Sequence, residues 1–237
     1  MGENVCIITG ASRGIGRAIA VDMSNKDLAD ILVLLSRSVK DLQKTVTLMN
    51  SEKEILICPM DLCDEQAIIN VVDEVHNKFG RIDYLVNCAG FVDPKSILET
   101  TYENLDRTFK TNIISVYVLT REVTRYMKKI GGKIINVAST AGMTPRPGWS
   151  AYAASKAALI NLSETLSAEL ESFDIKVYCV SPGRCATDLR KVLAPEEDPT
   201  TIMQPEEVAE VITSLLGDAG SCLDGQNMVI RKQLQKK

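Results

Sequence analysis

A tyrosine and a lysine four residues apart are the first pair in this sequence that could do chemistry. Tyr152 and Lys156 begin a segment whose pattern predicts an amphipathic helix. Residues i and i+4 share one face of a helix, so we expect the phenol and the ammonium to lie side by side. A free phenol titrates at about pH 10, and a neighbouring positive charge favours its ionised form. The pair therefore predicts a group that exchanges a proton with a carbonyl or alcohol oxygen.

Two further polar residues are candidates for the same site. Ser139 ends an apolar, strand-like run and precedes Tyr152 by thirteen residues. Its hydroxyl can donate a hydrogen bond to the same substrate oxygen. Asn112 is a polar residue within an otherwise apolar helical pattern, and the alternative is that it bonds its own helix backbone. A tyrosine and a lysine at this spacing are common in proteins, so the prediction depends on the presence of Ser139 and Asn112 beside the pair.

A glycine-rich turn follows the first apolar run of the chain. Its glycines are Gly10, Gly14 and Gly16, within the sequence Thr-Gly-Ala-Ser-Arg-Gly-Ile-Gly. Glycine lets the backbone turn tightly and approach a pyrophosphate, whose charge is attracted by the amides at the start of the next helix. The turn therefore predicts a dinucleotide site, and the alternative is an ordinary strand–helix loop.

The end of the second apolar run lacks the carboxylate that would accept a ribose 2′-hydroxyl. Arg37 stands there instead, and a guanidinium can bind a 2′-phosphate through paired hydrogen bonds. Arg13, inside the glycine-rich turn, could reach the same phosphate. Unless both arginines are solvated loop residues, the sequence favours NADP(H) over NAD(H).

The elements that must position these residues alternate between strands and helices. Short Val- and Ile-rich runs that are apolar on both faces are typical of parallel strands covered by helices. The pattern predicts an α/β fold, namely a doubly wound parallel sheet of about seven strands with helices on both faces. Ligands of such sheets bind beyond the carboxyl ends of the strands, where the candidate residues fall. The expected strands are 5–9, 30–36, 54–60, 82–87, 133–139, 175–181 and 226–231, and the expected helices are about 14–26, 38–52, 64–79, 101–130, 150–173 and 205–217.

The helix boundaries also carry sequence signals. Asp41 and Asp64 are expected near helix N-termini, whereas Gly80 and Gly217 are expected to end helices.

Length and composition favour one domain over residues 1–237. The chain is 45% hydrophobic and has a formal net charge of -4, so no basic excess suggests nucleic-acid binding. Its longest aliphatic run, residues 31–35, is too short to span a membrane. Seven cysteines without a Cys-x-x-Cys pair fit reduced thiols in the cytoplasm. A metal site is not expected, because His76 is the only histidine.

Taken together, these motifs resemble the short-chain dehydrogenase/reductase family, and their overall pattern is similar to that of 3-oxoacyl-carrier-protein reductases. The resemblance covers roughly residues 3–230 and implies a Rossmann fold. It also implies an enzyme that moves a hydride between NADP(H) and a carbonyl or alcohol, assembled as a homodimer or homotetramer. The motifs that carry it are Thr9 to Gly16, Asn87-Cys88-Ala89-Gly90, Asn112, Ser139, Tyr152 with Lys156, and Pro182-Gly183.

The resemblance implies roles for individual residues. Asn112, Ser139, Tyr152 and Lys156 match the family's catalytic tetrad, with Lys156 also bonding the nicotinamide ribose and Asn112 holding a water that relays protons. The basic residues of the turn and of the second strand end resemble the NADPH-preferring branch. The implied cofactor-binding residues are Gly10, Ser12, Arg13, Gly14, Ile15, Gly16, Arg37, Asp61, Leu62, Asn87, Ala89, Gly90, Tyr152, Lys156, Pro182, Gly183, Cys185 and Thr187.

The chain departs from the family pattern in two places. The usual aliphatic residue after Pro182-Gly183 is displaced by Arg184 and Cys185, and the last strand lacks the usual Asp-Gly-Gly ending. The second departure concerns subunit contacts and leaves the catalytic set untouched.

A substrate loop is expected over about residues 184–204, closing over the cofactor. Its cations Arg184, Arg190 and Lys191, together with Arg146 and Trp149, either recognise a phosphate or carboxylate or are solvated surface groups. The expected function is NADPH-dependent reduction of a ketone such as a 3-oxoacyl thioester. One alternative is a reductase of a phosphorylated or nucleotide-linked sugar or polyol. Another is a protein that binds NADP(H) without turnover, although the intact tetrad argues against it.

Overall fold

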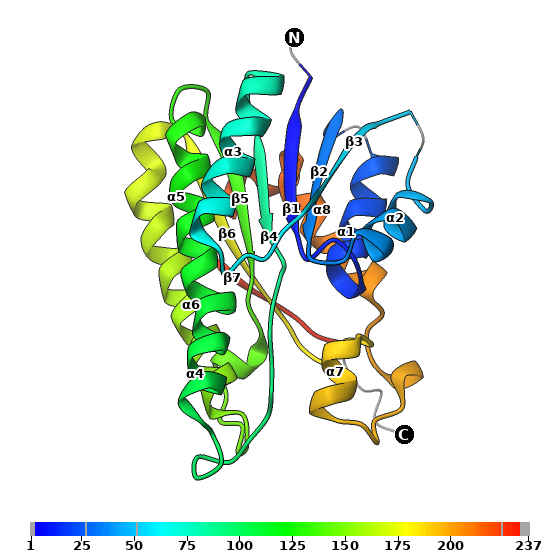
Figure 1. The fold of residues 1–237 in the computed structure, drawn as a ribbon, viewed down its shortest axis with the longest axis vertical. Coiled ribbons are helices and arrows are strands. Elements are labelled where there is room, and N and C mark those ends of the chain that lie inside the picture. Colours follow the sequence, from blue (N-terminus) through cyan, green and yellow to red (C-terminus); the bar gives the residue numbers. More distant parts are fainter. Residues whose placement is uncertain (1–2, 27, 51, 224, 233–237) are drawn as a thin grey trace.

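A computed structural model describes residues 3–26, 28–50, 52–223 and 225–232, which form a parallel sheet between two layers of helices (Figure 1). The strand order is β3-β2-β1-β4-β5-β6-β7, so the doubly wound fold predicted from the sequence is confirmed. Each predicted strand is present, with ends shifted by no more than two residues. The strands are β1 (Val5–Thr9), β2 (Ile31–Ser36), β3 (Glu54–Pro59), β4 (Tyr84–Asn87), β5 (Gly132–Val137), β6 (Ile175–Pro182) and β7 (Asn227–Ile230).

The strand order reverses at β1, and this reversal creates the place for a ligand. Ile7, the central residue of β1, pairs with Val33 of β2 on one side and with Leu85 of β4 on the other. The connections from β1 and β4 therefore leave in opposite directions along the sheet, which opens a crevice at their carboxyl ends. Because all the pairings are parallel, the ends of the other strands lie at the same edge.

Two hydrophobic clusters fix the helices to the sheet. On one face of the sheet, strand side chains that include Ile8 and Leu34 pack against α1, α2 and α8. The opposite set, which includes Ile7 and Val33, packs against α3, α5 and α6. Alternate residues of each strand point to opposite faces, so both faces of the central strands are buried. The helices are α1 (Gly14–Asn25), α2 (Val39–Val46), α3 (Glu65–Phe79), α4 (Tyr102–Phe109), α5 (Ser115–Met127), α6 (Ser150–Leu170), α7 (Asp188–Leu193) and α8 (Pro205–Leu216).

Most of the predicted helix boundaries hold. The Asp64 side chain accepts a hydrogen bond from the Ala67 amide at the start of α3, and Gly80 ends this helix in the left-handed region with φ of 75°. The start of α2 also agrees: Ser38 caps the helix, and Asp41 lies in its first turn, hydrogen-bonded to the Ser38 hydroxyl at 2.8 Å. This helix ends at Val46 rather than at residue 52.

The predicted helix over residues 101–130 is interrupted. A π-helix, Lys110–Ile114, separates α4 from α5 and contains Asn112. Hydrophobic periodicity could not reveal this turn, because one wide turn leaves the pattern on either side nearly unchanged. Such turns recur at functional sites.

The predicted substrate loop contains a helix that was not among the predicted elements. The hydroxyl of Thr187 accepts a hydrogen bond of 3.2 Å from the Arg190 amide and starts α7, which has only six residues. In Figure 1 this short helix stands apart from the two helix layers, beyond the carboxyl edge of the sheet. No helix in the described part of the chain combines the length and apolar character needed to span a bilayer.

Candidate active site

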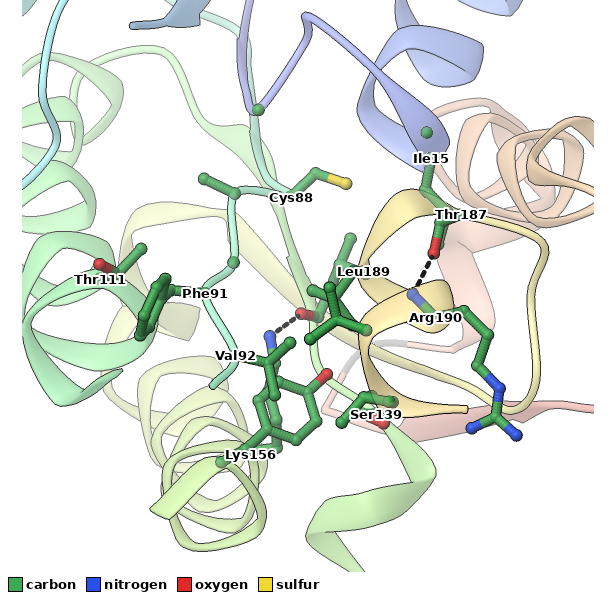
Figure 2. A pocket seen from close by; sticks show the side chains of 18 of the residues that line it. Ile15, Cys88, Phe91, Val92, Thr111, Ser139, Lys156, Thr187, Leu189 and Arg190 are labelled. Carbon is green, nitrogen blue, oxygen red and sulfur yellow. Dashed lines mark hydrogen bonds between the residues drawn. The ribbon is translucent and has the colours of Figure 1, made fainter. Parts of the chain in front are cut away.

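A cavity of about 760 Å³ lies at the carboxyl edge of the sheet, between the strand ends and α7 (Figure 2). Its size is within the range of pockets that hold organic ligands. It brings together all of the predicted site residues except Asn87 and Asn112. Those that line it are Gly10, Ser12, Arg13, Gly14, Ile15, Gly16, Arg37, Asp61, Leu62, Ala89, Gly90, Ser139, Tyr152, Lys156, Pro182, Gly183, Cys185 and Thr187.

The glycine-rich turn forms a cradle that side chains would fill. Gly10 has φ of 69°, and a Cβ at this position would lie 2.9 Å from the Cα of Ala89. A Cβ on Gly16 would overlap the carbonyl group of Gly10. The first turn of α1 has no acidic residue, and no side chain caps its amides. Open backbone and free amides at a helix N-terminus fit an anionic diphosphate.

The two arginines predicted to recognise a 2′-phosphate differ in their partners. Arg37 lies exposed on the cavity wall and makes no ion pair with any residue that the structure describes. Arg13 forms an ion pair with Asp188 of α7, with 3.6 Å between Nη1 and Oδ2. Both of these side chains are more than half exposed, so the pair is weak and can be exchanged for another anion.

The loop after β3 supplies a further part of the wall. Asp61 accepts a hydrogen bond of 3.0 Å from the Cys63 amide and lines the cavity beside Leu62. Met60 and Thr111 line the same part, and sequence reasoning had missed both.

Ser139 and Tyr152 come together at the centre of the cavity. Ser139 lies two residues beyond the end of β5, and its hydroxyl accepts a hydrogen bond of 3.1 Å from the Ala141 amide. Tyr152 lies in the first turn of α6 and is 7% exposed. Burial raises the pKa of Tyr152 to about 12, although a hydrogen bond with Ser139 acts in the opposite direction. The phenol is therefore protonated at neutral pH.

The sequence-based expectation that the Lys156 ammonium, together with the positive ring of an oxidised nicotinamide, favours the ionised phenol stays a prediction. The Lys156 amine donates to the Val137 carbonyl oxygen at 2.8 Å, and Nζ lies 5.9 Å from the centre of the Tyr152 ring. Burial lowers the pKa of Lys156 to about 8, below the usual 10.5. Desolvation therefore outweighs attraction between the two groups.

Asn112 lies behind the cavity wall and is fully buried. Its Oδ1 accepts a hydrogen bond of 2.8 Å from the Phe91 amide, and its Nδ2 donates to the Phe91 carbonyl oxygen at 3.0 Å and to Ser155 Oγ at 2.9 Å. The side chain thus joins the segment after Gly90 to α6 rather than bonding its own helix. The proton-relay role stays a prediction.

The Asn87 side chain also lies behind the wall, and its membership of the cofactor-binding set stays a prediction. Its Nδ2 donates to Asn136 Oδ1 at 2.9 Å and to Thr120 Oγ1 at 3.3 Å, so it ties β4 to β5 and α5. At the end of β1, the Thr9 hydroxyl accepts hydrogen bonds of 3.0 Å from the amides of Cys88 and Ala89. These bonds hold the backbone that lines the cavity.

The cations of the predicted substrate loop are already paired. Glu197 accepts hydrogen bonds from Arg184 at 3.1 Å and from Arg190 at 2.5 Å. The two guanidinium groups thus compensate the negative charge of the partly buried Glu197 carboxylate. Lys191 pairs with Asp188 at 3.5 Å. Arg146 differs, because no carboxylate of the described residues pairs with it.

An apolar wall near the catalytic residues was also missed. It consists of Val92 and of Leu189, Val192 and Leu193 from α7. The last three have the i, i+3, i+4 spacing of a helix face, which was the available signal. Arg107, which also lines the cavity, lies over the ring of Phe91, with 4.4 Å from its Cζ to the ring centre.

Comparison with known proteins agrees with this geometry. Residues 4–198 match the family model of the short chain dehydrogenases. Two relatives are named 3-oxoacyl-[acyl-carrier-protein] reductase FabG: the chain is 33% identical to the one from Thermotoga maritima, over 94% of each protein, and 30% identical to the one from Haemophilus influenzae, over 96% of each.

A solved structure is similar over nearly its whole length. The short chain dehydrogenase from Burkholderia cenocepacia, crystallised in complex with NADP, superposes with a TM-score of 0.86 at 28% identity, covering 97% of this chain and 96% of that one. The glycine cradle, the tyrosine–lysine pair and these similarities lead to one conclusion. The chain belongs to the short-chain dehydrogenase family of oxidoreductases.

Proposed function

We propose that this protein reduces a ketone to an alcohol with NADPH as the reductant. The observation that carries the proposal is that Ser139, Tyr152 and Lys156 line the same cavity as the glycine cradle. When bound there, the dinucleotide supplies the hydride that the carbonyl carbon receives.

Tyr152 is the proton donor in this proposal. Because burial holds its pKa at about 12, the phenol carries its proton at neutral pH and can give it to the carbonyl oxygen. The Ser139 hydroxyl, directed to the same place, donates a hydrogen bond to that oxygen as negative charge develops. Lys156 stands beside them as a cation below about pH 8 and binds the ribose of the cofactor.

The preference for NADP(H) rests on Arg37. Its guanidinium is at the end of β2, exposed to the cavity and free to pair with a 2′-phosphate. The NADP complex of the Burkholderia relative supports this assignment. The remaining predicted contacts, from Asp61 and Leu62 to Thr187, belong to the same proposal.

The lining of the cavity favours an acyl substrate over a polyol. Val92, Leu189, Val192 and Leu193 offer apolar contacts beside the catalytic residues, and two relatives are named 3-oxoacyl reductases. We therefore assign a 3-oxoacyl thioester or a similar ketone. Arg146 at the rim has no carboxylate partner among the described residues, which supports an anionic group on the substrate. A phosphorylated sugar or an acyl carrier would provide such a group.

We also propose a single-domain, cytoplasmic protein that forms a homodimer or homotetramer. The seven cysteines are all free, which supports a reducing compartment. Exposed Tyr102 on α4, Ile114 of the π-helix and Tyr117 on α5 form apolar surface of the kind found in subunit interfaces. Sedimentation measurements would test the assembly.

The activity is tested by following NADPH oxidation with acetoacetyl thioesters, diketones, quinones and keto sugar phosphates. Wild type should reduce at least one of the ketones, and Tyr152→Phe should lower kcat/KM by about a thousand-fold. NADPH affinity should remain nearly unchanged, because the phenol ring stays in place. Undiminished reduction by Tyr152→Phe would show that another group donates the proton.

A further inference from the structure

Val92 lines the cavity between two residues whose backbone groups are tied to buried side chains. The amide of Phe91 donates to Asn112 Oδ1 at 2.8 Å, and its carbonyl oxygen accepts from Asn112 Nδ2 at 3.0 Å. On the other side of Val92, the carbonyl oxygen and Oδ2 of Asp93 accept hydrogen bonds of 3.1 and 2.7 Å from Asn104 Nδ2. An asparagine side chain thus holds the chain on each side of Val92.

Asn104 is itself firmly placed within α4. Its amide donates to Thr101 Oγ1 at 3.2 Å, and its carbonyl oxygen accepts a hydrogen bond of 2.7 Å from the Thr108 hydroxyl. Asn104 and Thr108 are both buried. Because α4 also packs against α6, Asn104 fixes the segment after Gly90 relative to the helix that carries Tyr152.

The Asn104 side chain leaves one buried atom without a partner. Both groups that its amide faces are acceptors of Asp93, so the nitrogen must point toward them. No donor among the described residues reaches Oδ1. An unpaired buried carbonyl oxygen is unfavourable for stability. The two hydrogen bonds that position Asp93 therefore explain this asparagine better than a contribution to stability does.

The far end of the same segment is also attached. Lys95 pairs with Trp149 in an isolated parallel bridge, and its amine lies 3.2 Å from Asp93 Oδ2. Trp149 directly precedes α6 and lines the cavity. The backbone around Val92 is therefore held at residues 91, 93 and 95 and can yield little to a substrate that presses on it.

The rest of the apolar wall has a different support. Leu189 belongs to α7, which has no buried residue. A Cβ on Gly90 would lie 3.9 Å from Lys156 Nζ, so the segment passes close to the catalytic amine just before Val92. Figure 2 shows Val92 in the same part of the cavity as Lys156. A branch beside the reacting carbonyl group would thus meet a fixed side chain at Val92.

We propose that Val92 selects the shape of the ketone and that Asn104 is the positioning residue that fixes Val92. A straight chain fits past Val92, whereas a methyl branch next to the carbonyl carbon does not. Asn104 does not line the cavity and acts through Asp93. The proposal rests on the proposed function, because it takes a 3-oxoacyl thioester as the substrate.

Three isomeric substrates test the discrimination. They are the 3-oxohexanoyl, 2-methyl-3-oxopentanoyl and 4-methyl-3-oxopentanoyl thioesters, which have the same number of carbon atoms and differ in branching. In wild type, kcat/KM for the straight isomer should exceed that for at least one branched isomer by about ten-fold. Val92→Ala should reduce this ratio to about two-fold by raising kcat/KM for the branched isomer.

Asn104→Asp tests the positioning at unchanged side-chain size. A carboxylate cannot donate to Asp93 and repels it, so the ratio should fall to about three-fold while kcat for the straight isomer stays within about two-fold. Adding Asp93→Asn exchanges donor and acceptor, because the new amide can donate to the new carboxylate. The double variant should return the ratio to within about two-fold of the wild-type value.

Two controls separate positioning from general damage. Lys110→Ala removes an exposed ion pair with Asp106 at the end of the same helix and should leave the ratio within about two-fold. NADPH affinity should also stay within about two-fold in every variant, since none of these changes touches the glycine-rich turn. Trp149 is the only tryptophan of the chain and lines the cavity, so its fluorescence can follow this binding.

The outcomes distinguish the parts of the proposal. Equal kcat/KM for the three isomers in wild type, or an unchanged ratio in Val92→Ala, overturns the role of Val92. A ratio that falls in Val92→Ala but not in Asn104→Asp overturns the role of Asn104. If Asn104→Asp does not fold, Asp93→Ala removes the shorter of the two hydrogen bonds from the more exposed partner and must lower the ratio. Wild type that reduces none of the isomers removes the 3-oxoacyl assignment together with this proposal, whereas equal reduction of all three removes this proposal alone.

Discussion

The floor and the cover of the cavity are built in different ways. The floor consists of the strand ends and α6, where Thr9, Asn112 and Lys156 are buried and hydrogen-bonded to backbone groups. Within the cover, residues 184–204, α7 has no buried residue, and one of its contacts is the exposed ion pair of Asp188 with Arg13. Buried backbone hydrogen bonds are costly to break, whereas exposed ion pairs exchange partners readily.

This difference separates two tasks. A rigid floor keeps the proton donor and the phosphate cradle in fixed relative positions, which catalysis needs. A weakly held cover admits a large ligand and then excludes water around it. Substitutions in the floor should therefore alter stability or chemistry, and substitutions in the cover should alter rates of binding or substrate choice.

The largest effect is expected from Gly16→Ala in the floor. The added Cβ would overlap the Gly10 carbonyl group, so the turn must shift and the free energy of unfolding should fall by about 1–3 kcal/mol. Urea denaturation would measure this loss, and NADPH binding should weaken by more than about ten-fold. Gly217→Ala is the matched control, since its Cβ would meet only ordinary contacts at 3.6 Å and beyond. Equal stabilities of the two variants would contradict a tightly packed floor.

A second effect concerns the pH dependence of cofactor binding. The pKa of Lys156 is lowered to about 8, so its cationic form is present below that pH and is lost above it. Between pH 7 and pH 9 the cationic fraction falls by about ten-fold, and NADPH affinity, measured by Trp149 fluorescence, should fall by a similar factor.

The lowered pKa of Lys156 also makes the free energy of unfolding depend on pH. Between about pH 8 and pH 10.5 the unfolded chain binds more protons at Lys156 than the native protein does. The stability contributed by this group therefore increases as pH rises through that window.

The control for the cofactor-binding prediction is Lys156→Arg, which keeps its charge and should show an NADPH affinity that does not change between pH 7 and pH 9. A flat profile in wild type would mean that the amine does not bind the cofactor.

A smaller effect is expected at the rim from Arg146. If the substrate carries an anionic group, Arg146→Ala should raise KM for that substrate by about five-fold and leave kcat unchanged. Arg184→Ala is the comparison, because Arg184 is already paired with Glu197 and should change KM less. Equal changes for neutral and anionic ketones would remove the anion-binding role.

The smallest effect is expected from Asp188→Asn in the cover. This change frees Arg13 from its exposed ion pair, so NADPH affinity at low salt should rise by about two-fold. The gain should disappear at high ionic strength, where the pair is screened in wild type as well. A loss of affinity would instead place Asp188 among groups that hold the cover closed on the ligand.

The same contrast explains what could be predicted from the sequence. The floor was predictable because its residues follow strands whose apolar runs and spacing are visible, as with Gly10, Ser139 and Tyr152. The cover was not, because α7 is shorter than two full periods of a helix and starts at a single Thr187 cap. The ion pairs of Glu197 and the hydrogen bonds of Asn87 and Asn112 depend on tertiary contacts between distant segments.

The effect of burial on the pKa of Tyr152 could not be predicted for a related reason. The sequence shows that an ammonium lies one turn away, but it does not show how much water reaches either group. Burial raises the phenol pKa, and the Val137 carbonyl competes for the ammonium. Spacing alone therefore does not show how strongly burial acts on this group.

The last strand has a practical consequence for handling the protein. β7 pairs with β6 through Ile230 and Pro182, and the next amide, that of Gly183, also bonds Ile230. A tag, fluorophore or solid support joined close behind Ile230 would thus pull on the stem of the cover and disturb kinetic measurements. Attachment ahead of Val5 places the same label at the opposite edge of the sheet, away from the cavity (Figure 1).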